Sequence, residues 1–143
     1  MIRRAVLDTS TLVSAALRPG SVPYQALLQA FATCELCASA ETLAELERVL
    51  LRPAFDAYGT QRSRREFIDL YRRHVRLFAI SEADRANVKP PCRDPKDNEF
   101  LALLLAAEAH VLVSSDEDLL VLNPWRGIPV LKASEFLAAP DNP

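Results

Sequence analysis

Acidic residues gather in one segment of this 143-residue chain, residues 92–120, which reads CRDPKDNEFLALLLAAEAHVLVSSDEDLL. Asp94 and Asp97 precede its long apolar run, and Asp116 and Asp118 follow a shorter one. Carboxylates ligate hard divalent cations such as Mg²⁺ and Mn²⁺, and they transfer protons in hydrolytic reactions. The segment is therefore a candidate for metal-assisted or acid–base chemistry.

The apolar runs predict the elements that position these carboxylates. Asp94 suits an N-cap, Pro95 the first helical position and residues 100–107 the body of a buried helix. Residues 111–113 have the character of a buried parallel strand. A helix, a strand and an acidic turn form the second half of a βαβ unit, whose functional edge lies at the carboxyl ends of the strands. Asp116 is expected on that edge.

Two more carboxylates are expected at the same edge. Asp8 ends a strand predicted over residues 4–8, and Glu45 borders the apolar stripe of a helix predicted over residues 40–51. Adjacent strands lie about 4.8 Å apart, so Asp8 and Asp116 would crowd one cleft if their strands are neighbours. Crowded carboxylates without a nearby His or Cys favour Mg²⁺ or Mn²⁺ over zinc.

Helix capping is the structural alternative for several of these residues. The candidate caps are Asp8, Asp94 with Asp97 as its capping-box partner, and Ser115 with Asp118. Asp116 would gain only about 0.3 to 1 kcal/mol at a first helical position. Glu45 lies beyond any cap, although an exposed ion pair with Arg48 would contribute less than about 1 kcal/mol. Convergence on one edge, more than any single residue, favours a functional site.

The remaining segments alternate between the apolar spacing typical of helices and the short apolar runs typical of strands. Further helices are predicted over residues 9–17, 24–31, 63–77 and 133–137, and further strands over 36–39, 78–80 and 128–131. This alternation predicts a single α/β domain over residues 1–143, a three-layer α/β/α sandwich with a central parallel sheet.

Composition excludes several classes of protein. Half of the residues are hydrophobic, yet no stretch suits a membrane span and no signal-peptide pattern follows Met1, so a cytoplasmic location is expected. Three cysteines, Cys34, Cys37 and Cys92, indicate buried thiols and not a disulfide framework. The net charge of −2 lacks the bulk positive charge of a nonspecific nucleic-acid binder.

Four motifs together resemble the PIN domain family over the length of the chain. They are VLDTST at Asp8, AETLAEL at Glu45, RDPKDNEFLALL at Asp97 and LVSSDEDLL at Asp116. The last two also resemble a toxin subgroup of PIN proteins, relatives of the VapC-type toxins of toxin–antitoxin pairs. The chain differs from the usual family pattern in having serines at positions 10, 114 and 115.

The resemblance implies a metal-dependent ribonuclease with an acidic pocket and a cognate antitoxin. Its catalytic and metal-binding residues would be Asp8, Glu45, Asp97 and Asp116, with Ser10, Asp94 and Asp118 as auxiliary residues. One or two Mg²⁺ or Mn²⁺ ions would activate a water for attack on an RNA phosphodiester.

An acidic pocket repels RNA, so flanking cations are expected to contact the phosphates. Arg18, Arg48 and Arg52 are the candidates, together with the helix that carries six arginines between residues 62 and 76, although a solvated helix face also explains those six. The apolar run 100–107 and the first helices further predict a homodimer.

Two positions two residues apart have different expected roles. Asp116 directly follows the strand and is assigned to the metal, whereas Asp118 is expected to reach back to Ser115 as a capping-box partner. Residues two apart on a helix point roughly 200° apart, so one of them faces the cleft.

Other functional classes remain open. A haloacid-dehalogenase-like phosphatase also begins with a strand ending in Asp, but it needs a second Asp where Ser10 stands. A PIN-like RNA-processing protein, or a catalytically silent partner-binding module, would keep the fold. The presence of all four carboxylates disfavours the silent module.

Overall fold

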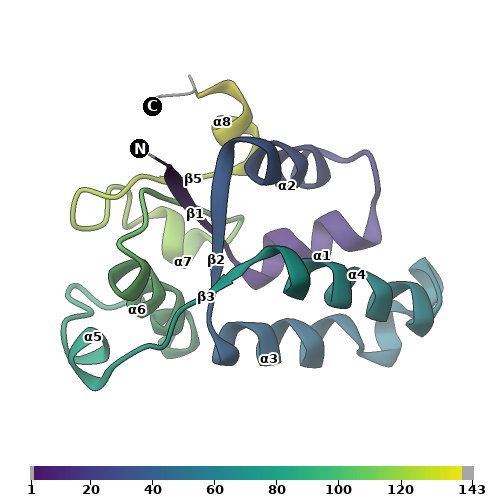
Figure 1. Cartoon of the computed structure of the whole chain (residues 1–143), viewed down its shortest axis with the longest axis horizontal. Helices are drawn as coiled ribbons and strands as arrows, with labels where there is room; N and C mark the ends of the chain where they lie inside the picture. Colours follow the sequence, from purple (N-terminus) through teal and green to yellow (C-terminus); the bar gives the residue numbers. More distant parts are fainter. Residues whose placement is uncertain (1, 140–143) are drawn as a thin grey trace.

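One parallel sheet organises the computed structural model, which describes residues 2–139 (Figure 1). Within those residues the sheet has five strands in the order β3-β2-β1-β4-β5. The strands are β1 (Arg3–Leu7), β2 (Cys34–Ala38), β3 (Arg76–Leu77), β4 (Val111–Val113) and β5 (Val130–Leu131). The strand order reverses beside β1, so the gap between the carboxyl ends of β1 and β4 is the topological switch point.

Helices connect the strands and cover both faces of the sheet. They are α1 (Thr9–Leu17), α2 (Val22–Thr33), α3 (Ala40–Leu50), α4 (Gln61–His74), α5 (Glu82–Ala86), α6 (Asn98–Ala107), α7 (Glu117–Leu120) and α8 (Ala133–Ala138), with 3₁₀ turns η1 (Pro53–Tyr58) and η2 (Pro95–Asp97). Figure 1 shows α1 to α4 on one side of the sheet and α5 to α7 on the other.

Strand side chains alternate between two apolar cores. Ala5 and Leu7 pack against α1 to α4 and α8, whereas Val6 and Leu112 pack against α6 and α7. This is the alternation that a sheet covered on both faces requires. The predicted three-layer α/β/α sandwich with a parallel sheet is confirmed.

Helix α6 is buried over most of its surface. Leu101 and Leu104 are fully buried, and Phe100 is 2% exposed. The apolar run 100–107 therefore packs in the core of this chain. It does not provide the exposed apolar surface that the homodimer prediction assumed for it, so that part of the reasoning is wrong. The homodimer itself stays a prediction.

Several element boundaries differ from those predicted, most clearly at α4 and β3. The predicted helix over residues 63–77 is α4, which ends at His74, because Val75 is already extended and β3 begins at Arg76. The predicted edge strand 78–80 is displaced toward the N-terminus, although Phe78 N still donates to Ala38 O at 2.9 Å. The short elements η1 and α5 were not predicted, since segments of five or six residues carry too little periodicity.

All three cysteines are free thiols, as predicted. Cys37 and Cys92 are buried, but Cys34 is only half-buried, so its predicted burial is wrong. Burial raises the pKa of Cys37 to about 11, which disfavours its reactive thiolate form. Among the described residues no helix has both the length and the apolar character needed to cross a bilayer.

We expect Leu101→Ala to destabilise the protein by about 2 to 5 kcal/mol, because it leaves a cavity beneath the sheet. The melting temperature should fall by roughly 5 to 15 °C in calorimetry. Leu77→Ala, at a side chain that is 57% exposed, is the control and should change stability by less than about 0.5 kcal/mol. Similar melting of both variants would contradict the assignment of α6 to the core.

Candidate active site

A cavity of about 440 Å³ opens at the carboxyl ends of β1 and β4, at the switch point of the sheet. Five carboxylates line it: Asp8, Glu45, Asp94, Asp97 and Asp116. They come from the β1–α1 turn, α3, the two ends of η2 and the turn after β4. All four predicted catalytic residues therefore meet at one cavity, and so do the auxiliary residues Ser10 and Asp94.

Asp8 is fixed by hydrogen bonds on both of its oxygens. One accepts from Thr11 N and from Ser10 Oγ, each at 3.0 Å, and the other accepts from Ser114 Oγ. Asp8 thus caps α1, as the structural alternative proposed, but it does so inside the cavity while only 3% exposed. Burial raises the pKa of Asp8, and the hydrogen bonds from Ser114 and Thr11 oppose that increase.

The three serines that depart from the family pattern connect the two turns. Ser10 Oγ and Ser115 Oγ lie 2.8 Å apart, and Ser114 Oγ accepts from Asp116 N at 2.9 Å while it donates to Asp8. These contacts join the turn after β1 to the turn after β4. The serines therefore orient Asp8 and Asp116 relative to each other.

Asp116, and not Ser115, is the N-cap of α7. Its Oδ1 accepts from Asp118 N at 2.9 Å, so the predicted capping box between Ser115 and Asp118 is wrong. The chain stays extended through Asp116, which moves the start of the helix to Glu117. Asp118 supplies only its backbone N–H to the cap and does not line the cavity.

Asp97 lies at the N-cap position of α6, but its side chain makes no capping hydrogen bond, and its predicted capping box with Asp94 is also wrong. Asp94 accepts from Lys96 N at 3.1 Å, and Pro95–Asp97 forms a 3₁₀ turn before α6 begins. The side chain of Asp97 is free to face the cavity. Burial, and then a hydrogen bond and repulsion with the neighbouring Asp116, raise the pKa of Asp97 to about 7.

Glu45 lies half-buried on α3, at the cavity wall. Burial raises its pKa, although Arg48 one turn away favours the charged form. Beside it, Thr9 is 8% exposed and its Oγ1 makes no hydrogen bond of good geometry. A buried hydroxyl without a partner calls for a specific explanation. A further polar group or ion in the cavity would supply one.

The donor set fits a hard divalent cation. Within residues 2–139, no group of three or more His, Cys, Asp or Glu side chains lies close enough together to hold a metal ion. The carboxylates nevertheless converge on one cavity, and the raised pKa values of Asp8, Glu45 and Asp97 are ones that a bound cation would lower. Oxygen-only ligands suit Mg²⁺ or Mn²⁺.

Three cations lie at the rim of the acidic cavity. Arg48 and Arg52 line it, and so does Lys96, which the sequence analysis did not single out. Nowhere in the described part of the chain does a carboxylate form an ion pair with any of the three. Arg18 ends α1 and does not line the cavity.

The arginines of α4 are largely engaged within the protein. Arg64 is 3% exposed, pairs with Asp56 and donates to Leu50 O at 2.9 Å. Arg65 and Arg72 both pair with Glu47 of α3. These contacts favour a structural role for α4 over RNA binding.

We predict that Asp97 makes the metal-free protein less stable as pH rises. Its folded-state pKa of about 7 exceeds the ordinary value of 3.8, so its contribution is complete below about pH 4 and is lost toward pH 7. Between about pH 5 and pH 7 the free energy of unfolding should fall by roughly 1 to 2 kcal/mol more in the wild type than in Asp97→Asn. Urea unfolding in chelator tests this, with the exposed Glu82→Gln as control; parallel wild-type and Asp97→Asn curves would contradict it.

A second prediction separates Asp116 from Asp118. Asp116→Asn keeps a side chain that caps α7 and removes one of the crowded charges, so without metal it should be as stable as the wild type or more stable. Asp118→Asn should change the free energy of unfolding by less than about 0.5 kcal/mol, because its side chain caps nothing. A loss above about 1 kcal/mol in Asp118→Asn, measured by urea unfolding, would restore the capping-box hypothesis.

Solved structures similar to this chain share its fold at low sequence identity. VapBC2 from Rickettsia felis, bound to a DNA fragment from its promoter, matches with a TM-score of 0.63 and 15% identity over 89% of this chain and 96% of that one. VapC20 from Mycobacterium tuberculosis, a sarcin–ricin loop cleaving toxin, matches with a TM-score of 0.52 and 13% identity over 76% of this chain and 86% of that one. Among curated proteins, none matches the sequence significantly.

A family model supplies the direct assignment. The model described as PIN domain matches residues 4–118, a range that contains all four predicted catalytic carboxylates. Since this range covers most of the chain, the chain belongs to the PIN domain family.

Proposed function

We propose that this protein is a divalent-metal-dependent endoribonuclease and the toxin of a type II toxin–antitoxin pair. The observation that supports this most strongly is the convergence of Asp8, Glu45, Asp97 and Asp116 on one cavity at the switch point. These carboxylates would hold Mg²⁺ or Mn²⁺. When bound, the ion would lower the pKa of a coordinated water and stabilise the charge on the transferring phosphoryl group.

The protein's own residues would orient the acidic site before the ion and the substrate bind. Ser10, Thr11 and Ser114 hold both oxygens of Asp8, so its orientation is set before any substrate binds. Before the ion binds, burial and the neighbouring Asp116 raise the pKa of Asp97 to about 7, so binding of the ion near neutral pH would displace a proton from this carboxyl.

Arg48, Arg52 and Lys96 would bind the phosphates that flank the scissile bond, since they line the same cavity. Arg18 does not line this cavity, so it is not assigned this role here. RNA is the proposed substrate because one similar fold belongs to a toxin that cleaves the sarcin–ricin loop.

A cognate antitoxin is the proposed partner, supported by the similarity to a VapBC2 complex that carries promoter DNA. A homodimer, a cytoplasmic location and a single domain over residues 1–143 complete the proposal. Light scattering at micromolar concentration distinguishes the dimer from a monomer.

The phosphatase alternative lacks its second carboxylate. Ser10 occupies that position, and its hydroxyl donates to Asp8. A PIN-like RNA-processing enzyme would use the same pocket on a different RNA, whereas a silent binding module would not cleave RNA.

We expect the purified chain to cleave single-stranded RNA with Mn²⁺ or Mg²⁺ and to lose this activity in chelator. Glu45→Gln should reduce the cleavage rate about 100-fold or more, because it removes a cavity carboxylate. Glu47→Gln is the matched control, since Glu47 lies on the same helix but pairs with Arg72 of α4. It should cleave at the wild-type rate.

Three results would contradict this proposal: cleavage that persists in chelator, no cleavage with any divalent ion, or equal losses in Glu45→Gln and Glu47→Gln.

A further inference from the structure

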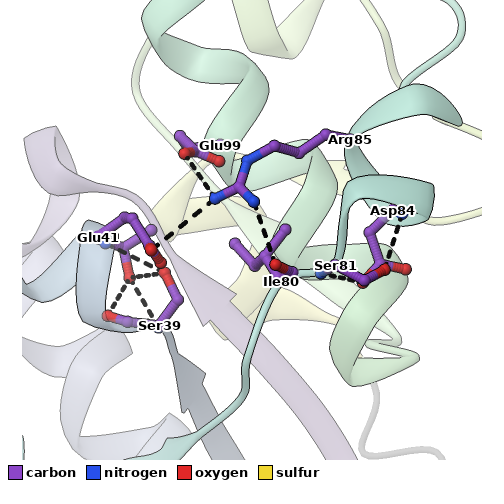
Figure 2. A network of polar contacts seen from close by, with 8 residues as sticks. Ser39, Glu41, Ile80, Ser81, Asp84, Arg85 and Glu99 are labelled. Atoms are coloured by element: carbon purple, nitrogen blue, oxygen red, sulfur yellow. Dashed lines mark hydrogen bonds and ion pairs between the residues drawn. The ribbon is translucent and has the colours of Figure 1, made fainter.

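Arg85 in α5 forms ion pairs with carboxylates of two helices, α3 and α6. Its Nη2 lies 3.1 Å from Glu99 Oε1 on α6 and 3.8 Å from Glu41 Oε2 on α3. Its Nη1 donates to Ile80 O at 3.1 Å. Figure 2 shows dashed lines from the guanidinium to the two carboxylates, each from a different helix.

The two partners of Arg85 are close in sequence to two cavity carboxylates. Glu41 lies four residues, about one helical turn, before Glu45 on α3. Glu99 lies two residues after Asp97, in the first turn of α6. Helices α3 and α6 also contact each other directly. Arg85 therefore connects the element that carries Glu45 to the element that follows Asp97.

Helix α5 presents Arg85 from a defined position. Ser81 and Asp84 form a reciprocal capping box, with Asp84 N donating to Ser81 Oγ and Ser81 N donating to Asp84 Oδ2, each at 3.0 Å (Figure 2). The helix also packs against α6. The short element is therefore fixed at its start and along one side.

We propose that Arg85 is a positioning residue that sets the separation of Glu45 and Asp97 and so tunes the affinity of the site for a divalent cation. This inference rests on the proposed function. The crowded carboxylates repel one another, which favours a wider cavity. The bridge from Arg85 opposes that widening from outside the cavity, without touching the cation.

The ion pairs of Arg85 are expected to contribute little to the free energy of unfolding. The side chains of Arg85, Glu41 and Glu99 are 41%, 51% and 34% exposed, and ion pairs this exposed contribute little to folding. Metal affinity is more sensitive than folding stability to such contacts, because mutation of a residue that orients a metal ligand typically changes the affinity about 10- to 100-fold. Arg85 acts one step further away, so a smaller effect of about 3- to 10-fold is expected.

The test is Mn²⁺ binding to the purified full chain, measured by calorimetric titration. Removing a positive charge near a cation site should tighten binding by electrostatics alone. If instead the ion pairs of Arg85 with Glu41 and Glu99, here called the Arg85 clamp, hold the cavity carboxylates together, the change in affinity has the opposite sign. Arg85→Gln should then bind Mn²⁺ about 3- to 10-fold more weakly than the wild type, with a melting temperature within about 2 °C of the wild-type value.

Arg72→Gln is the matched control. Arg72 is 44% exposed and pairs with Glu47 of α3, so this variant also removes one arginine that is ion-paired to α3, but it leaves the link to α6 intact. It should bind Mn²⁺ as tightly as the wild type or slightly more tightly.

A double-mutant cycle keeps the test decisive if Arg85→Gln folds poorly. Glu99→Gln should weaken Mn²⁺ binding in the wild type and have a smaller effect when Arg85 is replaced by Lys, whose single ammonium bridges the two carboxylates less well. Unchanged or tighter binding by Arg85→Gln, an equal loss in Arg72→Gln, or an additive cycle would overturn the proposal. If the wild type binds Mn²⁺ and cleaves RNA and Arg85→Gln behaves identically, only the role of Arg85 is refuted. If the wild type neither binds Mn²⁺ nor cleaves RNA, the proposed function itself is refuted.

Discussion

The pairing of β1 with β4 is the constraint on which the site depends. Leu7 lies opposite Val113 in parallel register, and Asp8 N continues the pairing by donating to Val113 O at 3.1 Å. The chain therefore leaves both strands side by side, which places Ser114 within hydrogen-bonding distance of Asp8. A shift of one residue in this register would turn the side chains of one strand to the opposite face and separate the two turns.

The rest of the fold tolerates a local electrostatic cost. Burial raises the pKa values of Asp8, Glu45 and Asp97, so the folded chain holds carboxylates where their charged forms are disfavoured. Fully buried apolar residues of β4 and α6 surround this edge, and such packing can maintain a destabilised site. Because a divalent cation would offset the repulsion, this electrostatically unfavourable region of the metal-free protein coincides with its proposed functional centre.

The sequence supports the layered fold and the acidic edge because both depend on long-range periodicity and on which residues follow strands. Finer features depend on one residue's backbone angles or on contacts between distant elements. Asp116 instead of Ser115 caps α7 because the chain stays extended for one more residue. In the sequence Arg64 is one of six similar arginines, but in the structure it is buried and pairs with Asp56 of η1. That contact joins separate elements and cannot be predicted from the local sequence pattern. Lys96 becomes a cavity residue only when η2 forms.

Two groups of positively charged side chains, which the net charge does not distinguish, have different roles: those ion-paired within the protein and those at the cavity rim. The chain carries a net charge of −2, and several α4 arginines pair with Asp56 or Glu47. Long-range attraction of a polyanion is therefore weak, and phosphate binding would depend on the cations at the cavity rim. Those cations adjoin carboxylates that repel the same phosphates until a divalent ion neutralises them. Metal binding would thus have two effects, because it would complete the reactive centre and let the rim cations hold RNA.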